Sequence, residues 1–467
     1  MMRGKVGVAV AVLCAACSST AAPRSPGPAV ASPNADAGPA LASPSPVADA
    51  IPDASAAERD AREDRRIAKM MKRVSEARAL PALKPVPGVV LARDALLAQV
   101  RAHLEREVPP EAITHEGLEL QLFGFLPTSF DYLAATFELL DAQLAGFYEP
   151  SDGTMYMAAD LDGTNAEATL AHELDHALQD QHFDLKAHSK YEAGKSDAQS
   201  AYDALAEGDA TSAMADVLFA KMMPGKTALD LPDDAFEANV LGSMGGAGGT
   251  GDVPSLMKSS LIAPYLVGTR FVNALRRAGG WSAVDAAWKD LPTTSEQILH
   301  VEKWRTHEPA LDVTVPTFAA LGGGWTAVDI DTTGELGLRL AFAEWMGVDR
   351  AKLAAAGWGG DHDVLLENGD KAAAAIHVRY DAGRKLGGKD DPFTLLTAGL
   401  EASLGKVTAK SPGWACIERP QLGPLAVLKH ERELVLIAGP VKHGDAWAAA
   451  GDCALAKRWA AEVAAQK

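Results

Sequence analysis

The residues with the clearest chemical potential form the run His172-Glu173-Leu174-Asp175-His176, an HExxH pattern. Histidines four positions apart lie on one face of a helix, close enough to bind one metal ion. Zinc with an open coordination position, next to a carboxylate base such as Glu173, has the components needed for hydrolysis. The alternative is a buried helix whose histidines only hydrogen-bond to neighbouring groups. Two histidines at this spacing, with a glutamate between them, favour the metal site.

The surrounding sequence predicts the helix that this pattern requires. Asp162-Gly163 predicts a turn, and Thr164 with Glu167 three positions later has the spacing of a capping box. No proline or glycine interrupts residues 167–182. The segment carries an apolar stripe at helical spacing, formed by Ala168, Leu170, Ala171, Leu174, Ala177 and Leu178.

His182 is the first candidate for a third metal ligand, and we reject it. It follows His176 by six residues, which is the spacing of metzincin peptidases, but those enzymes break the helix with a glycine between the two histidines. Gln179 stands at that position here and favours a continuing helix. His182 is therefore expected to point away from the metal.

Glu207 is the better candidate. It lies in a second predicted helix that starts with Ser196-Asp197 as its cap, and its small neighbours Ala206 and Gly208 suit close helix packing. It would complete a set of two histidines and one glutamate, leaving the fourth zinc position for water. Asp203 and Thr211, one turn away, could orient a ligand. The alternative for Glu207 is a solvated acidic helix face.

These segments resemble the zincin superfamily of metallopeptidases, in its gluzincin-like HExxH…E branch. HELDHALQDQHFDL followed by ALAEGDAT is similar to a group of predicted bacterial HExxH lipoproteins of unassigned substrate. Further similarity lies in LLDAQLAGFYEPSDGTMYM, APYLVGTRF and LPTTSEQILHVEKW, so that the resemblance covers roughly residues 130–310, with a weaker echo in residues 357–361.

The resemblance implies a zinc-dependent peptidase. His172, His176 and Glu207 would hold the zinc, and Glu173 would act as general base toward the attacking water. The developing oxyanion needs a second donor, for which Tyr265 and His300 are the candidates. The alternative for His300 is a helix-end histidine bonded to a carbonyl group.

A predicted β-hairpin precedes the zinc helix. Residues 145–148 and 154–157 flank Pro150-Ser151-Asp152-Gly153, a strong turn sequence. In zincins the strand at this edge pairs with an extended peptide, so the hairpin could bind substrate by strand addition, with Gly146 allowing close approach. The alternative is an ordinary hairpin of the core sheet.

The N-terminus has the pattern of an export signal. Arg3 and Lys5 precede an apolar run that is too short for a permanent membrane helix and that ends in a lipobox-like sequence with Cys17 as the acylated residue. We therefore expect export and a lipid anchor at the cell envelope, on its periplasmic face or outer membrane. The alternative is a cleaved signal and secretion.

Composition sets further limits. Residues 18–58 are mostly alanine, proline and serine, and predict a disordered tether. A charged helical stretch then covers residues 58–80. The net charge of −18 argues against nucleic-acid binding. In an exported protein, Cys416 and Cys453 are expected to form a disulfide across the apparent strands 425–428 and 434–437.

The predicted fold class is α+β. Residues 1–17 would be the signal peptide, 18–58 the tether, 59–310 a zincin-like catalytic domain that is mainly helical with a small sheet, and 311–467 a smaller α+β domain. In the second domain we expect helices at 334–345 and 392–404 and strands at 364–366 and 374–380.

Three functions compete. The first is an exported zinc peptidase acting on a protein or peptide. The second is a catalytically silent lipoprotein of zincin fold that binds a protein or cell-wall partner. The third is a zinc amidase acting on a peptide crosslink of the wall. The intact residues His172, Glu173 and His176 favour an enzyme, because a silent relative has no chemical need for all three.

Overall fold

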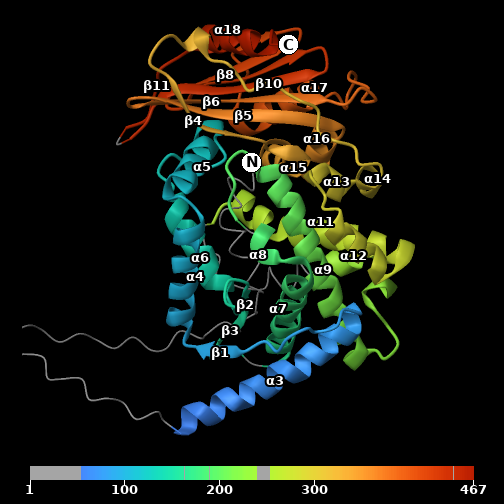
Figure 1. The fold of residues 1–467 in the computed structure, drawn as a ribbon. Coiled ribbons are helices and arrows are strands. Elements are labelled where there is room, and N and C mark those ends of the chain that lie inside the picture. The colour runs from blue at the N-terminus through green and yellow to red at the C-terminus, as the bar shows by residue number, and fades with distance from the viewer. Residues whose placement is uncertain (1–53, 162, 189, 239–252, 445, 467) are drawn as a thin grey trace, which may run out of the picture.

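The computed structural model describes residues 54–161, 163–188, 190–238, 253–444 and 446–466. This part of the chain is α+β, as predicted: a mainly helical region with a small sheet is followed by a large antiparallel sheet that carries helices on both faces (Figure 1). The signal sequence, Cys17 and residues 18–53 of the tether lie outside the described residues. Among the described helices, none combines the length and the apolar character needed to cross a bilayer.

The helical region surrounds the HExxH segment with long helices. The charged stretch predicted at 58–80 forms α3, and the HExxH segment lies within α7, which begins one residue before Thr164. The helices of this region are α3(Ala54–Arg78), α4(Arg93–Glu107), α5(Pro110–Phe123), α6(Tyr132–Gln143), α7(Gly163–Phe183), α8(Leu185–His188), α9(Ser196–Met222), α11(Ser255–Gly279), α12(Trp281–Lys289), α13(Ser295–Leu299) and α14(Val301–Arg305), with the short 3-10 turn η1(Ala228–Asp230) after α9.

The predicted hairpin is confirmed as β2(Gly146–Glu149) and β3(Thr154–Ala158), which pair antiparallel with Phe147 opposite Tyr156. On its other side, β3 pairs in parallel with β1(Gly88–Leu91). The strand order β1-β3-β2 leaves β2 at the edge of this sheet. The edge strand β2 lies directly against α7.

Helix α3 also packs against α7. Ile67, Met70 and Val74 of α3 are buried in one cluster with Leu170 and Leu174 of α7. The apolar stripe predicted for the HExxH helix is thus covered by α3 and by Met155 and Met157 of β3. This packing fixes α7 between the N-terminal helix and the small sheet.

The C-terminal region is organised around an eight-stranded antiparallel sheet with the order β4-β5-β6-β10-β9-β8-β7 and β11 paired to β10. The predicted strands and both predicted helices of this region are present. Its elements are η2(Ala319–Leu321), β4(Thr326–Asp331), α15(Gly334–Met346), α16(Val348–Ala355), β5(Trp358–Asn368), β6(Lys371–Tyr380), α17(Pro392–Leu404), β7(Ala409–Ser411), β8(Trp414–Arg419), β9(Gly423–His430), β10(Glu433–Lys442), β11(Ala448–Ala449) and α18(Cys453–Ala464).

Both faces of the large sheet are buried, and successive strand residues point to opposite faces. Val364 and Val435 pack with Trp459 of α18 on one face. Leu365 and Leu436 join the cluster on the other face, where α5, α15 and α17 lie. In Figure 1 the sheet therefore lies between α18 and the helical region.

The disulfide predicted between Cys416 and Cys453 is confirmed, with a Cα–Cα distance of 5.9 Å. It joins β8 to the first residue of α18 across a sequence separation of 37 residues. The bond therefore holds α18 on the outer face of the sheet.

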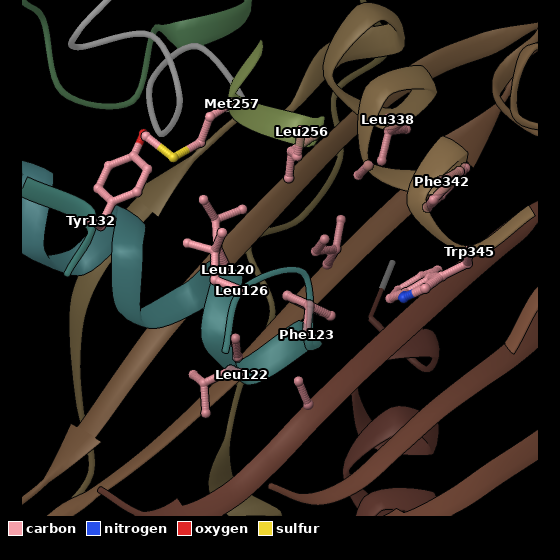
Figure 2. Close-up of a cluster of buried hydrophobic side chains, with 14 of the residues drawn as sticks. Leu120, Leu122, Phe123, Leu126, Tyr132, Leu256, Met257, Leu338, Phe342 and Trp345 are labelled. Atoms are coloured by element: carbon pink, nitrogen blue, oxygen red, sulfur yellow. The ribbon is translucent and has the colours of Figure 1, made fainter. Parts of the chain in front are cut away.

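The segment around residue 310 has no regular structure, but a common core connects the elements on its two sides. Figure 2 shows Leu120 and Phe123 of α5 beside Leu338, Phe342 and Trp345 of α15 in one buried cluster. Phe125, just after α5, stacks on Trp345 with ring centroids 4.6 Å apart. The large sheet is therefore packed directly on the helical region.

Helix α9 begins differently from the sequence prediction. Ser196 and Asp197 lie inside the helix, whose cap residue is Lys195. Ser196 donates its backbone amide and its hydroxyl to Asp331 of β4, and Asp197 accepts a hydrogen bond from the backbone amide of Ser295. The start of α9 is thus fixed by contacts that are distant in sequence.

Candidate metal centre

Three side chains meet where α7 and α9 cross. His172 and His176 lie on the same face of α7, and their Nε2 atoms are 3.1 Å apart. Oε2 of Glu207, on α9, lies 3.0 Å from Nε2 of His172 and 3.7 Å from Nε2 of His176. The structure thus brings together the three residues that the sequence analysis selected as metal ligands.

The separations among these atoms fit a tetrahedral zinc ion. Ligand atoms at roughly 2.0–2.1 Å from zinc in tetrahedral geometry lie roughly 3.3–3.4 Å from one another. The three observed distances, 3.0, 3.1 and 3.7 Å, bracket this value. The donor set also fits, since two imidazoles and one carboxylate are ligands that zinc prefers.

Close packing of two helices positions Glu207. A Cβ atom added to Gly208 would lie 2.1 Å from the backbone of Gly268 in α11, and one added to Gly268 would lie 1.8 Å from the carbonyl oxygen of Ala204. Only glycine fits at these two positions. The prediction that the small residues around Glu207 allow close helix packing is therefore confirmed.

Tyr265 lies one turn before Gly268 on α11 and reaches the same site. Its ring centroid is 5.8 Å from that of His172, and the side chain is 4% exposed. Of the two candidate oxyanion donors, Tyr265 therefore lies beside His172, one of the candidate metal ligands.

His300 lies elsewhere. It connects α13 to α14, and its Nε2 atom is 3.0 Å from the carboxylate of Glu335 in α15. Glu335 is also bonded by Arg339, so His300 belongs to a charged cluster under the large sheet. Its described contacts do not include the three converging residues. His300 thus lies at a helix end, as in the alternative interpretation, but its partner is the carboxylate of Glu335 and not a carbonyl group.

Glu173 is oriented by the hairpin. The backbone amide of Tyr148 in β2 donates to Oε2 of Glu173 at 3.0 Å. This amide belongs to the edge strand and faces away from β3 toward α7. The hairpin therefore fixes the carboxylate next to the two histidines, a role that the sequence did not indicate.

Burial and the ion pair with Glu207 determine the protonation of the cluster. Burial opposes ionisation of Glu207, but His176 and His172 outweigh it and lower its pKa to about 2. Burial lowers the pKa of His172. Burial acts in the same direction on His176, but Glu207 and Glu173 outweigh it and raise its pKa to about 10. The carboxyl group of Glu207 is thus ionised, and His176 is the imidazole of the pair that carries the extra proton.

This protonation predicts a pH dependence of zinc binding. A metal must displace the proton of His176, whose pKa is raised to about 10 by Glu207 and Glu173. Zinc binding near pH 7 should therefore release about one proton, and the affinity should rise about tenfold per pH unit up to pH 9. Calorimetric titrations in buffers of different ionisation enthalpy measure this release. An affinity that stays constant between pH 7 and 9 would contradict the prediction.

His182 points away from the centre, as predicted. Helix α7 continues through Gln179 to Phe183, and Nε2 of His182 bonds the carbonyl oxygen of Pro81 at 2.7 Å. Asp203 is 3.3 Å from Nε2 of Gln199 on its own helix. The predicted role of Asp203 and Thr211 in orienting a ligand stays a prediction.

A second group of acidic residues has a different character. Glu296, Glu308 and Asp381 have carboxylate oxygens close together, but Nζ of Lys303 lies between them at 2.7, 2.6 and 2.6 Å. The ammonium group already supplies the positive charge at this position. We therefore assign no metal to this group.

The three candidate metal ligands and Glu173 are buried. His172 is 1% exposed, His176 is 4% exposed, and Glu173 and Glu207 are fully buried. All four residues of β2 are buried as well. Strand addition requires an edge strand, and β2 is one. Because its residues are buried, a substrate could pair with β2 only if the groups that cover this strand moved.

The geometry defines a class of site: a buried centre of two histidines and one glutamate on two helices, with a second glutamate beside it. Comparison of the chain with protein-family models, with curated proteins and with solved structures found no match.

Proposed function

We propose that the protein is a zinc-dependent peptidase of zincin type. The observation that carries this proposal is the convergence of His172, His176 and Glu207, whose facing atoms lie 3.0, 3.1 and 3.7 Å apart, next to Glu173. A zinc ion held there would supply a Lewis acid and lower the pKa of a coordinated water toward neutrality.

The residues around the ion would transfer the proton and stabilise the oxyanion. Glu173 would accept the proton of the attacking water and pass it to the leaving amine, and the Tyr148 amide at Oε2 would hold its carboxylate in place. Tyr265, beside His172, is the candidate for stabilising the oxyanion. The ionised carboxylate of Glu207 favours binding of a cation.

The sequence supplies the setting for this activity. The lipobox-like segment ending at Cys17 and the net charge of −18 support an exported protein tethered at the cell envelope that acts on proteins or peptides and not on nucleic acid. The ligand set is equally suited to an amidase acting on a peptide crosslink of the wall. Zinc is the cofactor in both cases.

A second candidate is a catalytically silent protein of the same fold with a structural metal. The complete burial of Glu207 and Glu173 favours it, because a hydrolytic zinc must admit substrate. Such a protein would hydrolyse no peptide with or without zinc, and removal of zinc would only lower its stability.

The test is metal removal and restoration. The purified protein is assayed for release of peptides from casein before and after treatment with a zinc chelator, and again after stoichiometric zinc is added. Under the proposed function, hydrolysis disappears with the chelator and returns with zinc. Zinc-loaded protein that cleaves neither casein nor wall crosslink peptides would favour the silent protein instead.

A further inference from the structure

The side chain of Gln179 hydrogen-bonds residues of both helices of the metal centre. It lies on the HExxH face of α7, one turn after His176, and is fully buried. Its Oε1 atom is 2.9 Å from Nδ1 of His176. Its Nε2 atom donates to the carbonyl oxygen of Ala206 on α9 at 3.0 Å and to Oδ2 of Asp175 at 2.9 Å.

The partners of Gln179 determine which end of its amide faces the histidine. A backbone carbonyl and a carboxylate in this arrangement accept hydrogen bonds, so the group that contacts both Ala206 and Asp175 is the amino group. The amide oxygen therefore faces His176, and Nδ1 of His176 must carry the proton. This leaves Nε2, the atom that faces His172 and Glu207, as the ligand atom.

The same amide also links the two helices at the site. Ala206 directly precedes Glu207, so the hydrogen bond to its carbonyl oxygen ties the backbone beside Glu207 to the side chain that orients His176. A single residue thus constrains one ligand from each helix.

We propose that Gln179 is a positioning residue of the metal centre, which fixes Nε2 of His176 as the ligand atom and holds Glu207 at its distance. This inference rests on the proposed metal site. It requires no hydrolytic activity, so it can be tested by metal binding alone.

The test compares wild type with Gln179→Leu, Gln179→Glu and a control, Gln181→Leu. The control residue lies on the same helix but bonds the backbone of Leu83 and Lys84. Leucine removes all three contacts of Gln179. An ionised glutamate keeps an oxygen toward His176 but cannot donate to Ala206 or Asp175. If the leucine variant does not fold, the glutamate variant still tests the two hydrogen bonds that Gln179 donates.

Zinc affinity is measured by chelator competition, and the visible absorption of the cobalt-substituted protein reports ligand geometry. We expect both Gln179 variants to bind zinc about 10–100-fold more weakly and to show a shifted cobalt spectrum. The Gln181 variant should match wild type. Folded Gln179 variants with wild-type affinity and spectrum would overturn the role of Gln179 alone. A wild-type protein that binds no zinc would overturn the metal centre together with it.

Discussion

Replacement of Glu173 by glutamine is expected to lower peptide hydrolysis about 10²–10⁴-fold, because the amide cannot accept a proton from the attacking water. The bound zinc should stay, since the three converging ligand atoms belong to His172, His176 and Glu207. The glutamine has the same shape and can still accept the Tyr148 hydrogen bond through its oxygen.

The measurement is the rate of casein hydrolysis at equal zinc content, with Glu167→Gln as control. Glu167 is on the same helix and pairs with Lys221 at the surface, so its replacement should leave the rate unchanged. If the Glu173→Gln protein hydrolysed casein at the wild-type rate with full zinc, Glu173 would not be the base.

Replacement of Arg78 by alanine is expected to lower the free energy of unfolding by roughly 3–5 kcal/mol, since it leaves a buried carboxylate without its counter-charge. Arg78 at the end of α3 is fully buried and donates to both carboxylate oxygens of Asp209, at 2.6 and 3.0 Å. It also bonds Asp285 at 2.7 Å and lies over the ring of Trp281.

Urea unfolding measures this loss, and Lys72→Ala is the matched control. Lys72 is on the same helix with its side chain 79% exposed, so its replacement should change stability by no more than roughly 0.5 kcal/mol. A loss below about 1 kcal/mol for Arg78→Ala would mean that the Asp209 pair contributes little.

The parts of the structure that depend on local patterns were predictable from the sequence. Four-residue spacing placed His172 and His176 on one face, and small neighbours around Glu207 indicated a close helix contact that Gly208 and Gly268 provide. Turn residues predicted the hairpin, and two cysteines in a chain expected to be exported predicted the disulfide. Each of these signals acts over a few residues or follows from a general rule.

The parts that depend on distant pairs were not predictable. Arg78 and Asp209 are 131 residues apart, and neither has a sequence motif that indicates the other. His300 resembles a site residue in the sequence, but the fold places Glu335 beside it. The sequence indicated only that Gln179 lets the helix continue. Its contacts with His176 and Ala206 could not be predicted, because they depend on how α7 and α9 pack together.

The central claim is that His172, His176 and Glu207 bind one metal ion, and elemental analysis of zinc tests it most directly. Wild type, Glu207→Ala and Glu173→Gln are purified together and their zinc content is measured per chain. The account predicts one zinc in wild type, one in Glu173→Gln and a clear loss in Glu207→Ala. Wild-type protein without zinc, or a Glu207→Ala variant that retains it fully, would contradict the account.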